Sequence, residues 1–117
     1  MLKSPGELAE EAKKSIAEIS VAEVRKDLEA GKLPYLLLDV REPNEQAAGM
    51  IPQAVAMPRG VIEISILKVL QDENAPIVCY CGGGTRSLFG AEQLKRVGFK
   101  NVKSMAGGFK AWTQSGA

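Results

Sequence analysis

Histidine is absent from this chain of 117 residues, and cysteine occurs only twice, as Cys79 and Cys81. Without an imidazole, the chain cannot build a Ser-His-Asp triad, a Cys-His nucleophile pair or a zinc site that contains histidine. The two cysteines form neither the Cys-x-x-Cys motif of thiol–disulfide exchange nor part of a four-ligand metal cage, so we expect no metal site. A catalytic cysteine in this chain would therefore have to be activated by backbone dipoles and a nearby arginine.

Long apolar runs and an excess of one charge are also lacking. No apolar stretch approaches the ~20 residues that a membrane helix needs. The 15 basic and 14 acidic residues give a net charge of +1, which indicates neither a nucleic-acid partner nor a membrane partner. Residues 1–16 contain three glutamates and no apolar stretch, unlike a secretory signal, and we expect a cytoplasmic location.

The most informative segment is the glycine-rich run Cys81-Gly82-Gly83-Gly84-Thr85-Arg86-Ser87. It follows an apolar segment, residues 76–80, that has the β-branched and aromatic content of a buried strand, and it precedes a helical pattern over residues 88–97. A cysteine at such a turn lies near the positive end of the helix dipole and near unpaired backbone N–H groups. The glycines allow successive N–H groups to point inward around an anion. The run therefore predicts a loop that holds a thiolate or another negatively charged sulfur species.

Strand patterns alternate with helix patterns along the whole chain. Residues 61–70 fit both patterns, but their length and the preceding Gly60 favour a helix. This alternation predicts an α/β fold with a mainly parallel central sheet flanked by helices. The expected strands are residues 16–19, 35–38, 54–57, 76–80 and 101–104, and the expected helices are residues 5–14, 21–30, 42–48, 61–70, 88–97 and a terminal helix after Gly108.

The carboxyl ends of the strands predict where a ligand would bind. In a parallel sheet these ends lie at one edge, and ligands of α/β proteins gather there. Residues 39–42, residues 58–60 and the Cys81 loop each follow a predicted strand in the same sense. We therefore expect these three segments to lie together and to form one ligand-binding site.

Several short motifs follow one another between residues 37 and 112. They are Leu37-Leu38-Asp39-Val40-Arg41-Glu42-Pro43, Glu45, Gly49, Ile51-Pro52, Ala54, Met57-Pro58, Tyr80-Cys81, Gly84-Thr85-Arg86-Ser87, Gly98-Phe99, Asn101-Val102, Gly107-Gly108 and Trp112. In this order and spacing, the chain resembles the single-domain rhodanese family of sulfurtransferases over residues 16–116. The resemblance implies a rhodanese-like three-layer sandwich over residues 16–117, preceded by an N-terminal helical extension, residues 1–15.

The resemblance also implies a reaction. Cys81 would attack the outer sulfur of a small-molecule donor such as thiosulfate and become a persulfide, and cyanide or a thiol would then accept the sulfur. A protein thiol is a further class of acceptor. Neither a metal nor an organic cofactor is implied, and a monomer or a weak homodimer is expected. The positions that would bind the persulfide through their N–H groups are Gly82, Gly83, Gly84, Thr85 and Arg86.

Two features of the loop bear on its substrate. The spacing from Cys81 to Arg86 is C-x4-R, as in sulfurtransferases, whereas the similar cell-cycle phosphatases and arsenate reductases have one more residue and admit a larger tetrahedral oxyanion. Gly82-Gly83 stands where many relatives carry charged or polar side chains, which should weaken binding of the thiosulfate dianion. We expect that Arg59 or Arg41 compensates from the neighbouring turns.

Several roles remain open from the sequence. Asp39 and Arg41 are expected to support the loop rather than to act as acid and base. Arg86 either holds Asp39 or Glu42, or contacts the substrate. Cys79 lies inside the apolar strand and is expected to be an inert core residue. Two functional alternatives also remain, a persulfide carrier for a protein partner and a non-catalytic rhodanese-like binding module.

Overall fold

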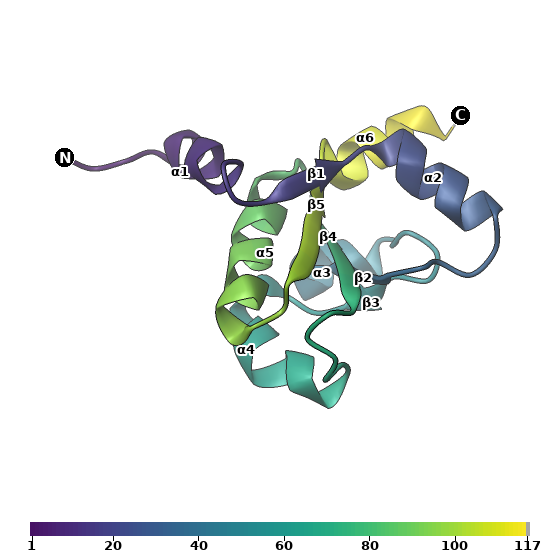
Figure 1. The fold of residues 1–117 in the computed structure, drawn as a ribbon. Helices are drawn as coiled ribbons and strands as arrows, with labels where there is room; N and C mark the ends of the chain where they lie inside the picture. Colours follow the sequence, from purple (N-terminus) through teal and green to yellow (C-terminus); the bar gives the residue numbers. More distant parts are fainter. Residues whose placement is uncertain (117) are drawn as a thin grey trace.

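A computed structural model describes residues 1–116 and contains one sheet of five parallel strands. The strand order is β1-β5-β4-β2-β3, so β4 is the central strand, with β5 on one side and β2 on the other (Figure 1). The parallel α/β fold predicted from the sequence is therefore confirmed. The strands are β1 (Ala17–Ile19), β2 (Leu36–Asp39), β3 (Val55–Ala56), β4 (Pro76–Tyr80) and β5 (Asn101–Met105).

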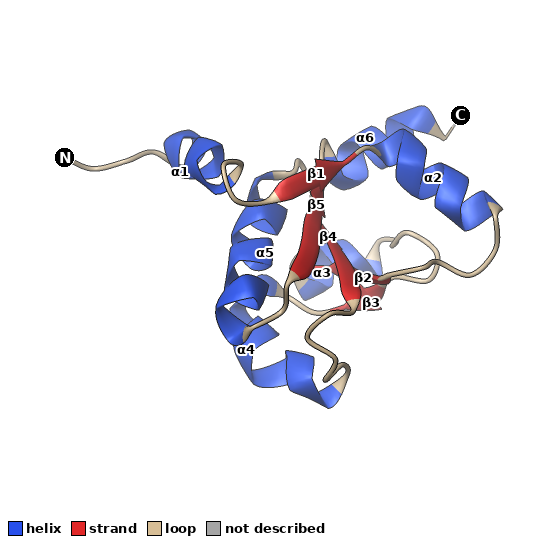
Figure 2. Cartoon of the chain, viewed as in Figure 1, coloured by secondary structure: helices blue, strands red, loops and turns tan. Residues whose placement is uncertain are grey.

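Helices cover both faces of the sheet (Figure 2). Successive side chains of β4 point to opposite faces, so Ile77 and Cys79 pack in one core with α5, whereas Val78 and Tyr80 pack in a second core with α2 and α6. The result is three layers. Among the described residues, no helix is both long enough and apolar enough to cross a membrane. The longer helices are α1 (Pro5–Ala12), α2 (Val21–Glu29), α5 (Thr85–Val97) and α6 (Gly108–Ser115), and α3 (Pro43–Ala47) is shorter.

The N-terminal helix α1 packs on α5 instead of standing free. It begins at Ser4, whose hydroxyl accepts the N–H of Glu7 at 3.1 Å while the Glu7 carboxylate accepts the N–H of Ser4 at 3.0 Å. Ala9 and Ala12 on its inner side are buried in the same core as α5. The residues before α1 extend away from the rest of the chain (Figure 1). The division into an extension, residues 1–15, and a domain, residues 16–117, stays a prediction.

The ambiguous segment after β3 is helical, but it forms three short turns and not the one helix expected over residues 61–70. These turns are η1 (Arg59–Val61), α4 (Ile62–Ser65) and η2 (Ile66–Lys68). Ile62 and Ile66 are fully buried, whereas Ile64 between them is 73% exposed. Burial every fourth residue is the helical period, and the β-branched side chains explain why no long regular helix forms.

Helix α5 begins three residues earlier than the sequence predicts. Its N-cap is Gly84, whose φ of 103° is a left-handed conformation that glycine adopts without a side-chain clash. The first turn of α5 therefore starts at Thr85, inside the glycine-rich run. The N–H groups of that turn belong to the Cys81 loop.

Candidate active site

Backbone hydrogen bonds join the carboxyl ends of β2, β3 and β4. The N–H of Val40 donates to the Tyr80 carbonyl at 3.0 Å, and the N–H of Met57 donates to the Asp39 carbonyl at 2.9 Å. The three segments that follow these strands therefore begin side by side, as the sequence predicts. The Cys81 loop follows β4.

The Cys81 sulfur is surrounded by the loop that follows it. Its Sγ accepts the N–H of Gly84 at 3.1 Å and the N–H of Ser87 at 3.2 Å, and it lies 3.5 Å from Ser87 Oγ. The residue is 1% exposed, so these donors act in a site from which water is largely excluded. Hydrogen bonds to an ionised acceptor are stronger than bonds to a neutral one, so these N–H groups are positioned to bind an anionic acceptor.

Other N–H groups of the loop are not used by the protein. Within residues 1–116, the N–H groups of Gly82, Gly83, Thr85 and Arg86 donate to no protein acceptor. Those of Thr85 and Arg86 belong to the first turn of a 13-residue helix, where no partner within the helix exists and where the helix dipole is positive. The loop therefore has spare donors for a second anionic atom beyond Sγ.

The first turn of helix α6 is hydrogen-bonded to the loop. The N–H of Phe109 donates to the Cys81 carbonyl at 2.7 Å, and the N–H of Lys110 donates to the Gly82 carbonyl at 3.0 Å. This contact requires glycine at position 108, because a Cβ there would lie 2.5 Å from the Cys81 carbonyl oxygen and 2.6 Å from that of Gly82. Gly107-Gly108 is one of the motifs of the resemblance, but the link between Gly108 and the loop could not be read from the sequence.

Two buried serines support the loop from within. Ser87 Oγ donates to the Gly84 carbonyl at 3.2 Å and lies 2.7 Å from Ser104 Oγ on β5. Both serines are fully buried. Sequence reasoning gave neither of them a role. The only signal for Ser104 was a small polar residue at an inward position of a predicted strand.

Asp39 and Arg41 form a buried pair behind the loop. Asp39 accepts from Arg41 Nη2 at 2.8 Å and from the Tyr80 hydroxyl at 2.6 Å, and the Arg41 guanidinium also donates to the Gly49 carbonyl. Burial and the Asp39 carboxylate raise the pKa of Tyr80 well above its usual range, so its hydroxyl remains a donor. Because Arg41 is 4% exposed and already paired, it does not supply the free charge that the sequence analysis expected of it.

Arg86 pairs with a carboxylate that the sequence analysis did not consider. Its Nη1 and Nη2 donate to Glu45 Oε1 and Oε2 at 2.7 and 3.0 Å, so the expectation that it holds Asp39 or Glu42 is wrong. Glu45 lies in the first turn of α3, where its Oε1 also accepts the N–H of Glu42. The hydrogen bonds from Arg86 lower the pKa of Glu45 to about 2, despite partial burial.

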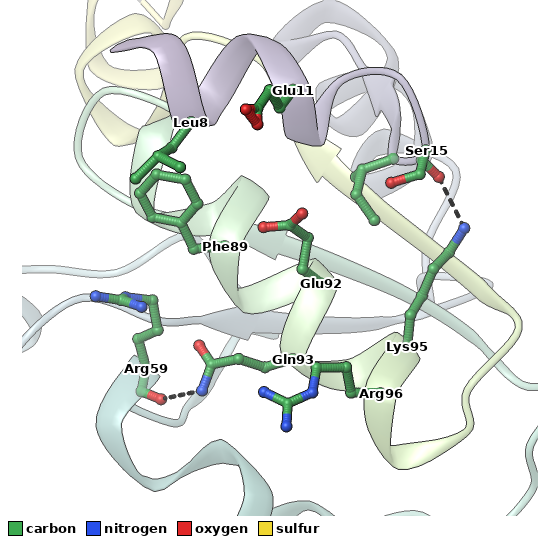
Figure 3. A pocket seen from close by; sticks show the side chains of 10 residues that line it. Leu8, Glu11, Ser15, Arg59, Phe89, Glu92, Gln93, Lys95 and Arg96 are labelled. Atoms are coloured by element: carbon green, nitrogen blue, oxygen red, sulfur yellow. Dashed lines mark hydrogen bonds between the residues drawn. The ribbon is translucent and has the colours of Figure 1, made fainter. Parts of the chain in front are cut away.

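The Arg59 side chain turns towards α5. Its guanidinium carbon is 5.6 Å from the centre of the Phe89 ring, and its carbonyl accepts from Gln93 Nε2 at 3.0 Å. These residues line a cleft of about 650 Å³ between α1 and α5, with Leu8 on the α1 side (Figure 3). The Arg59 side chain thus contacts α5, and its N–H donates to the Val40 carbonyl at 3.1 Å, but none of the contacts described for Arg59 is with the loop at residues 81–86. The expected compensation by Arg59 has no support in this geometry.

Cys79 lies two residues before Cys81 on the same face of β4, inside the core. It is fully buried, and burial raises the pKa of its thiol to about 12. Both cysteines are free thiols. Cys79 therefore has little thiolate at neutral pH.

The fold and the site together define a class of protein. It is a small α/β domain whose central parallel strand leads into a glycine-rich loop around one buried cysteine. The family model described as "Rhodanese-like domain" matches residues 20–115. The chain therefore belongs to the rhodanese-like family.

Similar proteins fit this assignment. A protein of Allochromatium vinosum named "Sulfurtransferase" is 37% identical over 81 residues, which cover 69% of this chain and 74% of that protein. "Thiosulfate sulfurtransferase GlpE" of Pseudoalteromonas translucida is 35% identical over 94 residues, covering 80% and 86%. The solved structure of RPA3614 from Rhodopseudomonas palustris, described as of unknown function and a possible tyrosine phosphatase, has a TM-score of 0.86 and 27% identity, covering 100% and 94%.

Replacing Gly108 by alanine tests the contact between α6 and the loop. The Gly108→Ala variant should lose more folding free energy than the control Gly98→Ala, because Gly98 also has a positive φ but has no atom within 4 Å of an added Cβ. Gly98→Ala should cost about 1–3 kcal/mol from backbone strain alone. Urea unfolding measures both values. Equal losses would show that the close approach of Gly108 to the Cys81 loop does not matter.

The Arg86–Glu45 pair predicts a specific pH dependence. The pair lowers the pKa of Glu45 from 4.5 to about 2. The ion pair therefore contributes fully to the free energy of unfolding above pH 4.5, and this contribution is lost as the pH falls towards 2. The difference in unfolding free energy between the wild type and Glu45→Gln should therefore narrow over that interval in urea titrations. A difference that stays constant would mean that the ion pair does not form in solution.

Proposed function

We propose that this protein is a sulfurtransferase that carries a sulfane sulfur on Cys81 as a persulfide. The observation that carries the proposal is the pair of N–H groups, from Gly84 and Ser87, that donate to Cys81 Sγ at 3.1 and 3.2 Å. Donors fixed around a buried sulfur favour its anionic form before any substrate binds and need no reorganisation during the reaction. This arrangement suits a thiolate nucleophile.

The first half-reaction loads the cysteine. The Cys81 thiolate attacks the outer sulfur of a donor such as thiosulfate, a new S–S bond forms, and the S–S bond within the donor breaks. Sulfite leaves with the electron pair, and the enzyme retains a persulfide whose terminal sulfur is anionic. The spare N–H groups of Gly82, Gly83, Thr85 and Arg86 are the proposed ligands of that terminal sulfur.

The second half-reaction unloads the cysteine. A nucleophilic acceptor, either cyanide or a thiolate, attacks the terminal sulfur, and Cys81 leaves as the thiolate that began the cycle. Bond making and bond breaking balance without an external oxidant or reductant. No proton transfer by a side chain is required, which is consistent with a site that has no histidine. The acceptor class includes small thiols and protein thiols.

The names of the relatives support sulfur transfer. The similar proteins of Allochromatium vinosum and Pseudoalteromonas translucida carry sulfurtransferase names, and the second name specifies thiosulfate. The description of RPA3614 makes phosphate-ester hydrolysis a second candidate. We favour sulfur transfer because Arg86 is already paired with Glu45. A phosphatase needs its loop arginine to bind the phosphate oxygens.

Intact mass after incubation with thiosulfate tests the proposal. The wild type should gain about 32 Da, one sulfur atom, from the covalent intermediate. Cys79→Ser should gain the same mass, because burial raises the pKa of Cys79 to about 12 and makes it a poor nucleophile. Cys81→Ser should gain nothing, and addition of cyanide should return the loaded wild type to its original mass with formation of thiocyanate.

Other outcomes distinguish the alternatives. Loading without release to cyanide or small thiols, but with release to a protein thiol, would favour a persulfide carrier. Failure to load with thiosulfate, polysulfide or mercaptopyruvate would contradict the proposal and favour a binding module. A sulfur adduct that persists in Cys81→Ser would show that the nucleophile has been assigned to the wrong residue.

A further inference from the structure

The two arginines beside the Cys81 loop, Arg86 and Arg41, are each paired with a carboxylate. Arg86 is the only cationic side chain of the loop, and its guanidinium donates to both carboxylate oxygens of Glu45. Arg41, behind the loop, is paired in the same way with Asp39. Neither arginine has an uncompensated positive charge to offer to an incoming anion.

The Arg86–Glu45 pair lies directly against the loop. A Cβ built on Gly82 would lie 3.0 Å from Arg86 Nη2 and 3.6 Å from Glu45 Oε2. The two side chains remain 36% and 31% exposed, so the pair stands where a donor from solution would meet the residue next to Cys81. The Glu45 carboxylate therefore cancels the positive charge of Arg86 beside the residue that follows Cys81.

Glu45 is held there by more than its ion pair. Its Oε1 accepts the N–H of Glu42 at 3.0 Å, which fixes the carboxylate to the first turn of α3. The low pKa of about 2 keeps the carboxylate ionised at any pH near neutrality. The negative charge is thus a permanent part of the site and is not removed by a small shift in pH.

We propose that Glu45 is a specificity-determining residue that makes this site select sulfane donors with at most one negative charge, such as organic thiosulfonates and persulfides, over dianions such as thiosulfate. The inference rests on the proposed sulfur transfer and names its donor class. A dianion gains little attraction from Arg86, because Glu45 neutralises its charge. The backbone N–H groups remain as the attraction, and they suit a single charge on the transferred sulfur.

The chemistry of a thiosulfonate donor is the same as that of thiosulfate. The Cys81 thiolate attacks the outer sulfur of R–SO2–S⁻, the bond between that sulfur and the sulfonyl group breaks, and the sulfinate leaves with the electron pair. The enzyme is left with the same persulfide. Benzenethiosulfonate and thiosulfate therefore form a matched pair of probes that differ by one unit of charge in the donor.

The test compares kcat/KM for the two probes in the wild type and in Glu45→Gln, with cyanide as the acceptor. The glutamine can still accept the N–H of Glu42, so the start of α3 is preserved. Removing one charge a few ångströms from the donor should raise kcat/KM for thiosulfate about 3–8-fold more than for benzenethiosulfonate. Added salt should barely change the thiosulfate rate of the wild type, but it should lower that of Glu45→Gln, in which the charge of Arg86 is released.

Two further variants serve as controls. Glu73→Gln removes one partner of an exposed ion pair with Lys100, near the amino-terminal end of β4. This substitution should leave kcat/KM unchanged for both probes. Glu45→Asp keeps the charge and should keep the preference of the wild type. Because Glu73→Gln changes the net charge by the same amount, it separates a local effect of Glu45 from an effect of overall charge.

The outcomes separate this inference from the proposed function. Absence of turnover together with absence of a sulfur adduct on Cys81 for both probes would overturn the sulfur transfer itself. If both probes are turned over and Glu45→Gln changes kcat/KM by the same factor for each, only the donor selectivity would be overturned. If Glu45→Gln does not fold, the salt dependence of the wild-type rate with thiosulfate is the test. A rate that falls steeply with added salt would mean that Arg86 attracts the dianion and that Glu45 does not neutralise Arg86, which would overturn the inference.

Discussion

The hydrogen bonds that two backbone N–H groups donate to the Cys81 sulfur are the interaction on which the rest of the site depends. Gly84 and Ser87 can donate together only because α5 begins at Thr85, within the loop. The remaining contacts maintain that geometry. Helix α6 binds the loop carbonyls, and Ser104 holds Ser87 from β5. A charged acceptor roughly doubles the strength of such bonds, which is why we propose that the arrangement serves an anionic sulfur.

The balance of charge at this site differs from that of a site built to bind a strongly charged oxyanion. Each nearby arginine already has a carboxylate partner, Arg86 with Glu45 and Arg41 with Asp39. The positive field at the sulfur therefore comes mainly from backbone dipoles, which have fixed directions and a short range. Such a field suits the single sulfur anion of the proposed reaction and gives little attraction to more highly charged anions. This is the physical basis of the donor preference inferred above.

The features that follow from local patterns could be predicted from the sequence. Alternation of apolar strands and amphipathic helices predicted the parallel α/β fold, and the strand–glycine–helix pattern predicted the loop around Cys81. The start of α5 was missed because a positive φ at Gly84 lets the helix begin inside the glycine run. The division of residues 61–70 into short turns was missed because β-branched residues fit both periods.

Long-range partners could not be predicted in the same way. Three acidic residues, Asp39, Glu42 and Glu45, lie within seven positions, and the long side chain of Arg86 can reach several of them. Only the geometry of α3 selects Glu45. Likewise, the contact of Gly108 with the Cys81 carbonyl joins positions 27 residues apart, for which neither periodicity nor composition carries a signal.

A crystal structure of the sulfur-loaded protein would test the central claim most directly. The account predicts one extra sulfur atom bonded to Cys81 Sγ, lying inside the loop within hydrogen-bond distance of the N–H groups of residues 82–86. Cys79 should be unmodified. An added sulfur that points away from these N–H groups, or that is attached to Cys79, would contradict the claim that the loop is a receptor for a persulfide anion.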